Sequence, residues 1–478
     1  MHERSVDVAI IGAGTAGLTA RRSALASGAK SVVMIDGGPL GTTCARVGCM
    51  PSKLLIAAAD AAHHIEAAST FGVVSAGHRV DGPAVMKRVQ VERDRFAGFV
   101  QRSIAAMPEE EVLRGWARFE SPTRLQVRRL DGGSVTIDAK TVVIAAGTEP
   151  WIPPEFRDCH DRVLTNESVF ELPDLPESIA VLGTGVIGLE LGQAMHRLGV
   201  RTRLFNLSTR VGPLRDPDMQ ALSRQIFEAK LNLSLGIRDL RAEPVAGGVQ
   251  LSWTDEAGHA QRETFSHVLA ATGRRPNLER LGLDALELPR DEKGYPRFDH
   301  RTMQIGETPL FLAGDFSLER SLLHEAADEG RIAGSNAARF PEVEAQTRRT
   351  PLGIVFTEPN VATVGTPIED LDAKLHAFGE IDYSDQGRAR VMAVNEGAVR
   401  IWGDLECGRL VAAEMIGPRA EHTAHLLAWA IQQGMTVDRA LEMPFYHPVI
   451  EEGIRTALQS LSKALKHRGR KENCSPGV

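Results

Sequence analysis

Residues 6–36, VDVAIIGAGTAGLTARRSALASGAKSVVMID, decide the fold of the N-terminal part of this chain. An apolar run rich in β-branched residues leads into the pattern G-x-G-x-x-G, and a helix-length segment and a second apolar run follow. This order predicts a β–α–β unit with Gly12, Gly14 and Gly17 in its first turn. The first glycine permits the tight turn, the second lets backbone approach a pyrophosphate, and the third lets helix and strand pack closely. The stretch therefore predicts a dinucleotide site at a helix N-terminus.

The same plan recurs in residues 177–206, ESIAVLGTGVIGLELGQAMHRLGVRTRLFN. A residue that binds ribose hydroxyls is expected on the second strand of each unit, where Asp36 stands in the first and Asn206 in the second. Asn206 can hydrogen-bond a ribose, but it lacks the charge that would repel a 2′-phosphate. Arg210 is close enough in sequence to contact such a phosphate. NAD and NADP therefore both stay open for the second unit, with NAD favoured.

Composition is that of a globular protein of several domains. At about 100–200 residues per domain, 478 residues predict about three domains. The formal charge of 55 − 62 = −7 recommends neither nucleic acid nor anionic lipid as a partner. No stretch reaches the ~18 consecutive apolar residues of a membrane span. Five cysteines are too few for a secreted disulfide framework and the N-terminus resembles no cleavable signal, so a cytoplasmic, thiol-reducing setting is expected.

One pair of cysteines stands in a reactive context. Residues 41–55, GTTCARVGCMPSKLL, hold Cys44 and Cys49, and no second pair completes a zinc site. Pro51 predicts a helix start just after Cys49. A helix N-terminus and the nearby Lys53 both favour a thiolate. The context favours a redox-active disulfide over two structural thiols.

With these motifs the sequence resembles the class I pyridine nucleotide–disulfide oxidoreductases, the flavoprotein family of dihydrolipoamide dehydrogenase, glutathione reductase and mercuric reductase. Residues 41–53 are close to that family's signature G-G-T-C-x-x-x-G-C-x-P-S-K. Five further motifs follow in the family's order: AAGT (145–148), ATGRRPN (271–277), FLAGD ending at Asp315, LLHEAADEG (322–330) and YHPVIEE (446–452).

The resemblance implies an α/β fold with two Rossmann-like dinucleotide-binding domains, one for FAD and one for NAD(P), and a C-terminal α+β dimerisation domain. The implied borders are a discontinuous FAD domain at 1–150 and 276–347, an NAD(P) domain at 151–275 and a dimerisation domain at 348–465. Prolines in the connectors at 148–158 and 340–351 agree with these borders. The basic, polar residues 466–478 predict a disordered tail.

Cofactor contacts also follow from the resemblance. Gly12, Gly14 and Gly17 would contact the FAD pyrophosphate, Asp36 the adenosine ribose and Asp315 the ribityl chain. The resemblance assigns further cofactor-binding residues: Thr43, Lys53, Gly147, Gly183, Gly185, Gly188, Asn206 and Gly273. Of these, the second glycine set and Asn206 would hold the nicotinamide dinucleotide.

Catalytic roles are implied in the same way. Cys49 would be the flavin-proximal sulfur and Cys44 the sulfur that exchanges with substrate, while Lys53 and Glu190 would form an ion pair beside the flavin. His447 would supply and accept the proton for thiol exchange, and Glu452 would orient its imidazole. In the family this histidine comes from the other subunit, which implies a homodimer with composite active sites.

Dihydrolipoamide dehydrogenase is the member that the chain resembles most. A glutathione reductase would have arginines just after position 206, where Leu207 stands, and the paired terminal cysteines of mercuric reductase are missing. Ala45, Arg46 and Val449 depart from the usual residues near the disulfide. The expected reaction is oxidation of dihydrolipoyl groups by NAD⁺, on a lipoyl-bearing acyltransferase or carrier protein of a 2-oxo acid dehydrogenase or glycine cleavage complex. The alternatives are an NADPH-linked reductase of another disulfide or of a metal ion, and a non-catalytic redox-sensing flavoprotein.

Overall fold

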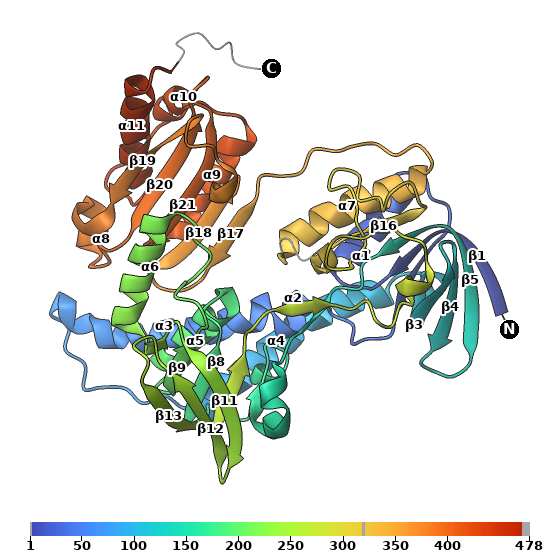
Figure 1. The fold of residues 1–478 in the computed structure, drawn as a ribbon, viewed down its shortest axis with the longest axis horizontal. Coiled ribbons are helices and arrows are strands. Elements are labelled where there is room, and N and C mark those ends of the chain that lie inside the picture. The colour runs from blue at the N-terminus through green and yellow to red at the C-terminus, as the bar shows by residue number, and fades with distance from the viewer. Residues whose placement is uncertain (1, 318–320, 471–478) are drawn as a thin grey trace. The chain divides into compact units, whose positions relative to one another are not determined.

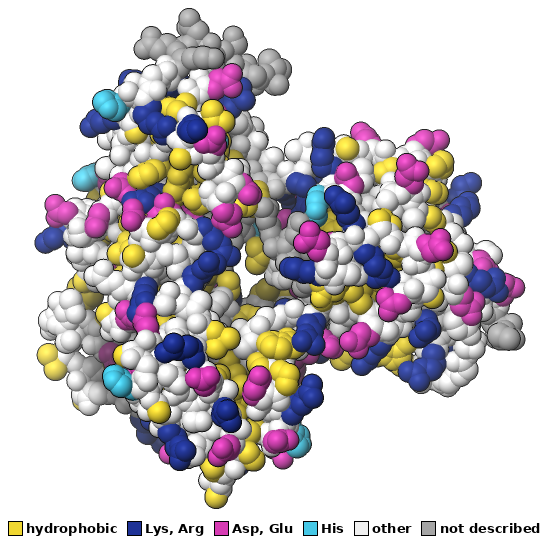
Figure 2. All heavy atoms as spheres, in the orientation of Figure 1, with side chains coloured by type: hydrophobic (Ala, Val, Ile, Leu, Met, Phe, Trp, Pro, Cys, Tyr) yellow, Lys and Arg dark blue, Asp and Glu magenta, His cyan; other side chains and the backbone are white. Residues whose placement is uncertain are grey.

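The computed structural model describes residues 2–317 and 321–470, and the chain divides into two compact units (Figure 1). The first unit comprises Met1–Pro51, Arg88–Trp151 and Gly273–Arg349, and the second comprises Ser52–Lys87, Ile152–Thr272 and Thr350–Val478. On the face seen in Figure 2, basic and acidic side chains are interspersed on both units. No helix among the described residues is long and apolar enough to cross a membrane.

A parallel sheet in the order β3-β2-β1-β5-β16 forms the centre of the first unit. Strand β4 pairs antiparallel with both β3 and β5, so that five of the strands close on themselves. The strands are β1 (His2–Ile11), β2 (Val32–Asp36), β3 (Val112–Ser121), β4 (Arg124–Arg129), β5 (Ser134–Ile144) and β16 (Leu310–Leu312). A short antiparallel pair, β6 (Thr148–Pro150) with β15 (Arg274–Pro276), carries the two segments expected to cross between domains.

Helices α1 (Thr15–Ala26) and α7 (Leu323–Arg339) lie side by side in the first unit (Figure 1). They approach closely because α7 presents glycine to the α1 backbone. A Cβ atom at Gly330 would lie 2.3 Å from the carbonyl oxygen of Ala16, and one at Gly334 would lie 2.1 Å from that of Ala20. Three further helices lie in the N-terminal part of the chain: α2 (Thr43–Val47), α3 (Cys49–Ala67) and α4 (Gly82–Ala105).

The second β–α–β unit builds a five-stranded parallel sheet in the order β10-β9-β8-β14-β7. An antiparallel meander, β11-β12-β13, packs on it, and Phe205 meets the rings of Trp253 and Phe265 edge-on at 4.9 and 5.9 Å. The elements are β7 (Val163–Leu164), β8 (Ser178–Leu182), α5 (Val186–Arg197), β9 (Arg201–Phe205), α6 (Pro217–Lys230), β10 (Leu233–Ser234), β11 (Arg238–Val245), β12 (Gly248–Thr254), β13 (Ala260–Phe265) and β14 (His267–Ala270).

The C-terminal part of the second unit is an antiparallel sheet in the order β17-β18-β21-β20-β19 with helices packed on it. Its strands are β17 (Leu352–Val355), β18 (Asn360–Gly365), β19 (His376–Asp382), β20 (Ala398–Asp404) and β21 (Leu410–Gly417). Its helices are α8 (Gly387–Val391), α9 (Ala420–Gln432), α10 (Val437–Leu441) and α11 (Glu452–His467).

The structure confirms the expected fold class, with both β–α–β units and a C-terminal α+β part. Strand β19 was not among the features indicated by the sequence, and its Gly379 lies under α11, where a Cβ atom would be 2.0 Å from the backbone nitrogen of Leu461. The predicted domain borders stay predictions. Of the predicted tail, residues 471–478 lie outside the described residues.

A buried carboxyl group joins α6 to the C-terminal sheet. Glu414 in β21 is 2% exposed and accepts hydrogen bonds from the backbone nitrogens of Arg215, at 2.7 Å, and Asp216, at 3.0 Å. Asp216 in turn pairs with Arg400 of β20 at 2.6 Å. Burial, and then the nearby Asp216 carboxylate, raises the pKa of Glu414 to about 7. The folded protein therefore holds a proton on Glu414 at a pH where the unfolded chain has lost it.

This raised pKa predicts a loss of stability as the pH rises. The Glu414 contribution is fully present below 4.5, the ordinary pKa of a glutamate, and is lost as the pH rises through about 7. The loss is on the order of 3 kcal/mol. We expect Glu414→Gln, which cannot titrate, to flatten the dependence of the urea unfolding free energy on pH between 5 and 8. An unchanged slope in the variant would contradict this assignment, whatever the variant's stability at a single pH.

Candidate active site

In the first glycine turn, two glycines have no room for a side chain, and the third, where a pyrophosphate is expected, has open space beside it. Gly12 has φ +112°, and a Cβ atom there would lie 2.2 Å from the carbonyl oxygen of Ala145. A Cβ atom at Gly17 would lie 1.9 Å from the carbonyl oxygen of Gly12, so both positions are closed to a side chain. At Gly14, the N-cap of α1, no described atom lies within 4 Å of an added Cβ. A pyrophosphate can therefore approach the free N–H groups of the α1 N-terminus at Gly14.

Asp36 holds this turn together from the end of β2. Its Oδ2 accepts from the backbone nitrogen of Ala13 at 2.7 Å, and its Oδ1 accepts from that of Gly38 at 2.7 Å. Arg114 lies 3.8 Å from Oδ1 and donates through Nη2 to the carbonyl oxygen of Gly38 at 2.6 Å. The buried Nη1 of Arg114 has no hydrogen-bond partner among the described residues. A polar ligand beside Asp36 could accept a hydrogen bond from that nitrogen. No sequence pattern had indicated Arg114.

Asp315 directly follows the end of the same sheet. It begins a short 3₁₀ turn after β16, and burial raises its pKa while the Arg274 guanidinium opposes that rise. Arg274 itself is held by Thr148, whose Oγ1 and carbonyl oxygen both accept from it at 2.7 Å. Gly147 and Gly273 occupy the adjoining left-handed positions, with φ +64° and +109°. The crossover strands β6 and β15 thus place a cation that favours the ionised form of Asp315.

The second glycine turn repeats the first. Gly183 has φ +103° and would clash with the carbonyl oxygen of Ala271, and Gly188 would clash with that of Gly183, if either carried a Cβ. Gly185 is the N-cap of α5 with φ −77° and ψ −170°, against φ −77° and ψ −172° at Gly14. No described atom lies within 4 Å of an added Cβ at Gly185. The two turns therefore have the same geometry, and each leaves a helix N-terminus open where an anion could bind.

Asn206 organises the loop that follows β9. Its Nδ2 donates to the Thr184 Oγ1 at 2.7 Å and to the carbonyl oxygen of Arg210 at 2.9 Å. The amide nitrogen also lies 3.1 Å from the Ser208 Oγ, so its N–H groups join this loop to the second glycine turn. Oδ1 is the atom of the amide that could accept from a ribose hydroxyl. Leu207, the next residue, is 72% exposed.

The cysteine motif forms two helix starts. Thr42, at φ 62°, caps α2 by accepting from the backbone nitrogen of Ala45 at 3.3 Å. Cys44 is half-buried in α2, one residue after Thr43, and Cys49 is the exposed first residue of α3. Gly48 folds back toward the start of the loop, since an added Cβ would lie 3.2 Å from the Cα of Cys44. The helix start predicted beside Cys49 is confirmed.

Lys53 and Glu190 form the expected ion pair within the second unit. Lys53 Nζ lies 2.7 Å from Oε2 of Glu190, whose side chain is 4% exposed. The other carboxylate oxygen accepts from the backbone nitrogen of Phe356 at 3.0 Å. Lys53 Nζ also lies 4.5 Å from the centroid of the Phe356 ring. Phe356 thus fixes both partners of the pair, and no sequence motif had indicated it.

Helix α5 extends this contact along one face. Gln193, three residues after Glu190, accepts from the backbone nitrogen of Glu358 at 2.7 Å and donates to its carbonyl oxygen at 3.0 Å. Arg197, one turn further, pairs with Glu358 at 2.9 Å and with Asp60 of α3 at 2.7 Å. The polar side of α5 therefore binds α3 and the chain after β17.

His447 and Glu452 form the second expected pair. His447 Nδ1 lies 3.0 Å from each carboxylate oxygen of Glu452, which also accepts from the backbone nitrogen of Val449 at 3.2 Å. The hydrogen bond from His447, and then that from Val449, lowers the pKa of Glu452. The carboxylate favours Nδ1 as the donor, which leaves Nε2 of the 80% exposed imidazole as the nitrogen that could accept a proton.

Within the second unit, Lys53 contacts Glu190 and His447 contacts Glu452. The other predicted residues Cys44, Cys49, Asp36 and Asp315 belong to the first unit. No group of three or more His, Cys, Asp or Glu side chains within residues 2–317 and 321–470 could hold a metal ion.

Comparison with known proteins decides the family. The family described as pyridine nucleotide-disulphide oxidoreductase matches residues 6–330, and its dimerisation domain matches residues 352–458. The chain belongs to the pyridine nucleotide-disulphide oxidoreductase family. Membership implies FAD and a nicotinamide cofactor, and the dimerisation domain supports a homodimer.

Relatives within the pyridine nucleotide-disulphide oxidoreductases have different activities. The chain is 30% identical to dihydrolipoyl dehydrogenase 3 of Pseudomonas aeruginosa, over 95% of this chain and 97% of the relative. It is 31% identical to a mercuric reductase of Streptomyces lividans, over 95% and 96%. The crystal structure of LpdA from Mycobacterium tuberculosis matches with a TM-score of 0.81 at 25% identity, over 95% of this chain and 99% of that one.

The Lys53–Glu190 pair predicts an asymmetric response to substitution. Lys53→Met leaves a buried carboxylate without its cation and should cost about 2 kcal/mol, a value discounted because Lys53 is one-third exposed. The double variant with Glu190→Gln should recover at least half of that loss, because no buried charge then remains. Urea unfolding followed by circular dichroism measures both values. If the loss of unfolding free energy in the double variant equals the sum of the losses in the two single variants, the two side chains act independently.

Proposed function

We propose that this chain is an FAD-dependent dihydrolipoyl dehydrogenase that oxidises dihydrolipoyl groups with NAD⁺ through Cys44 and Cys49. The observation that carries the proposal is the His447–Glu452 pair, with both carboxylate oxygens 3.0 Å from Nδ1, in a chain that also has the cysteine pair at two helix starts. Identity of 30% to a dihydrolipoyl dehydrogenase over nearly the whole chain supports the choice of substrate.

Residues of this chain that would hold FAD are Gly12, Gly14, Gly17, Asp36, Thr43, Gly147 and Asp315, and Gly183, Gly185, Gly188, Asn206 and Gly273 would serve the nicotinamide dinucleotide. The open N-terminus of α1 and the unsatisfied Nη1 of Arg114 fit an anionic, hydroxyl-rich ligand. When bound, FAD supplies the transfer of two electrons between the nicotinamide and the disulfide. Lys53 and Glu190 would form the ion pair that the family resemblance implies beside the flavin.

Thiol exchange is the part of the reaction that the chain's own side chains perform. A dihydrolipoyl thiolate attacks the sulfur of Cys44, the Cys44–Cys49 bond breaks, and Cys49 leaves as a thiolate. The second dihydrolipoyl thiol then displaces Cys44, so that substrate leaves as the cyclic disulfide and the enzyme keeps two reduced sulfurs. His447 accepts the thiol protons at Nε2 and returns one to a departing sulfur. Glu452 stabilises the imidazolium form that this transfer creates.

The dimer would complete the site. By the family resemblance, His447 of the partner subunit serves the cysteine pair, which fits an imidazole that is 80% exposed in a single chain. A cytoplasmic lipoyl-bearing acyltransferase or carrier protein, of a 2-oxo acid dehydrogenase or glycine cleavage complex, would present the dihydrolipoyl group.

A second candidate function is reduction of another disulfide or of a metal ion with NADPH. Asn206, which lacks a charge that would repel a 2′-phosphate, favours this candidate, as does 31% identity to a mercuric reductase. The exposed Leu207, which stands where an arginine would bind that phosphate, favours NAD.

Steady-state assays with each substrate test the proposed reaction. The FAD-loaded protein should reduce lipoamide with NADH at least tenfold more efficiently, in kcat/KM, than it reduces glutathione disulfide or Hg²⁺ with either nicotinamide. Cys44→Ser should abolish lipoamide turnover, and His447→Gln should lower it by about 10²–10⁴-fold. No lipoamide reduction by flavin-loaded wild-type protein would overturn the proposal.

Coenzyme preference is predicted to depend on position 206. Asn206→Glu adds a carboxylate that accepts from both ribose hydroxyls and repels a 2′-phosphate, so the ratio of kcat/KM for NADH over NADPH should rise about tenfold or more. Leu207→Arg, the matched change beside it, should move the ratio the other way. An unchanged ratio in both variants would show that the 2′ position of the coenzyme lies elsewhere.

A further inference from the structure

Three carboxylates are buried on one stretch of α7. Glu325, Asp328 and Glu329 are 4%, 3% and 3% exposed. Buried charges are costly unless each is paired and hydrogen-bonded. These three carboxylates, on the helix that packs on α1, therefore need partners from elsewhere in the first unit.

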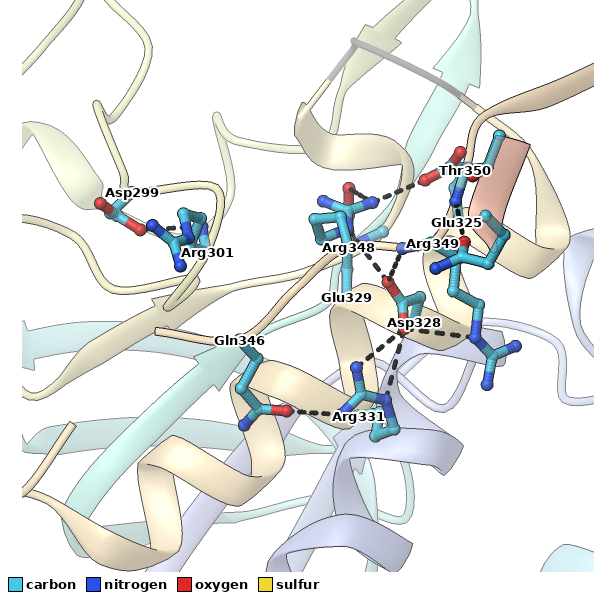
Figure 3. A network of polar contacts seen from close by, with 12 residues as sticks. Asp299, Arg301, Glu325, Asp328, Glu329, Arg331, Gln346, Arg348, Arg349 and Thr350 are labelled. Carbon is cyan, nitrogen blue, oxygen red and sulfur yellow. Dashed lines mark hydrogen bonds and ion pairs between the residues drawn. The ribbon is translucent and has the colours of Figure 1, made fainter. Parts of the chain in front are cut away.

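Arg348 is the partner that all three share (Figure 3). Its Nη2 lies 2.6 Å from Oε2 of Glu325 and 3.2 Å from Oε1 of Glu329, and its Nε lies 3.1 Å from Oδ2 of Asp328. The flat guanidinium group can serve several carboxylates at once, which an ammonium group cannot do with fixed geometry. Arg348 belongs to the last residues of the first unit, far in sequence from the motifs of the cofactor site.

The neighbouring arginines reach only the middle carboxylate. Arg331 lies 3.0 Å and Arg349 3.7 Å from Oδ1 of Asp328 (Figure 3). Three guanidinium groups thus balance three carboxylates. Glu329, like Glu325, pairs with Arg348.

The second oxygen of Glu329 reaches the strand end that precedes Asp315. Its Oε2 accepts from the backbone nitrogen of Gly314 at 2.7 Å in a fully buried hydrogen bond. Gly314 has φ +86°, and an added Cβ would lie 2.9 Å from the Cβ of Ala16. The hydrogen bond holds the Ala313–Gly314 peptide, which directly precedes the residue that carries the Asp315 side chain.

Burial raises the pKa of Glu329 to about 7, and the Arg348 guanidinium opposes that rise. Loss of Arg348 would leave Glu329 predominantly protonated at neutral pH, and a neutral carboxyl is a weaker acceptor for an N–H group than a carboxylate. Arg348 therefore strengthens the hydrogen bond that holds Gly314.

We propose that Arg348 and Glu329 are positioning residues for FAD, which hold the Ala313–Gly314 peptide, and with it the backbone that leads into Asp315, so that the Asp315 carboxylate meets the ribityl chain. This inference rests on the proposed FAD site, in which Asp315 binds the ribityl hydroxyls. A cluster that served stability alone would not need its carboxylate aimed at the backbone of the cofactor turn, since apolar residues of similar volume stabilise a core equally well.

Release of FAD from the loaded protein tests the proposal. Arg348→Met should raise the rate constant of FAD dissociation, measured by the recovery of flavin fluorescence, at least tenfold. Arg349→Met removes the same charge from the adjacent residue, which contacts Asp328 and is 70% exposed, and should change that rate less than twofold. Equal rates for Arg348→Met and wild type, or an equal rise in Arg349→Met, would overturn the proposal.

A double-mutant cycle separates positioning from general stability. In an Asp315→Ala background, Arg348→Met should change FAD dissociation less than twofold, because the side chain on which it acts is gone. A tenfold effect that persists in this background would overturn the proposal. If Arg348→Met does not fold, Arg348→Lys, which keeps the charge but not the fork, should raise the rate about threefold or more, and a wild-type rate would count against the idea. Wild-type protein that binds no FAD would instead overturn the proposed function.

Discussion

Both nucleotide-binding turns depend on a close approach of backbone to backbone that only glycine allows. At Gly12 and Gly17, and again at Gly183 and Gly188, a single added carbon would lie within 1.9–2.5 Å of a carbonyl oxygen. This closeness presses the start of each helix onto its strand and leaves the N-cap glycine between them open. The backbone contact that closes each turn also orients the free N–H groups at the start of the helix, where an anion could bind.

Charges in this chain are organised by segments distant in sequence. The polar face of α5 is held through Glu190, Gln193 and Arg197 by α3 and the chain after β17. The carboxylates of α7 are held in the same manner by Arg348. In each case a buried carboxylate of a helix has a partner from a segment outside the sheets and helices: the Phe356 backbone nitrogen for Glu190 and Arg348 for the acids of α7. The active groups are thereby coupled to the connectors as well as to the sheets on which they lie.

Motifs that act through local backbone geometry could be predicted. The two glycine turns and the helix start at Cys49 depend on residues within a few positions of one another, so spacing indicated them, and the family resemblance of residues 446–452 indicated the His447–Glu452 pair. Arg114, Phe356 and Arg348 could not be predicted, because each acts on a partner 19 or more positions away with no local pattern. Strand β19 was missed for a related reason, since helix contact requires glycine where a strand would ordinarily show a β-branched residue.

The sequence by itself determined the fold class, the two glycine turns, the helix start beside the cysteine pair and the family, because these depend on short patterns whose physics is local. Only the tertiary structure decided which distant groups contact these motifs. It placed the Phe356 amide on Glu190, the unsatisfied nitrogen of Arg114 beside Asp36, and the Arg348–Glu329 pair behind Asp315. Such contacts arise when sheets and helices bring distant side chains into a low-dielectric interior, where each buried charge must find a partner that its own neighbours along the chain cannot supply.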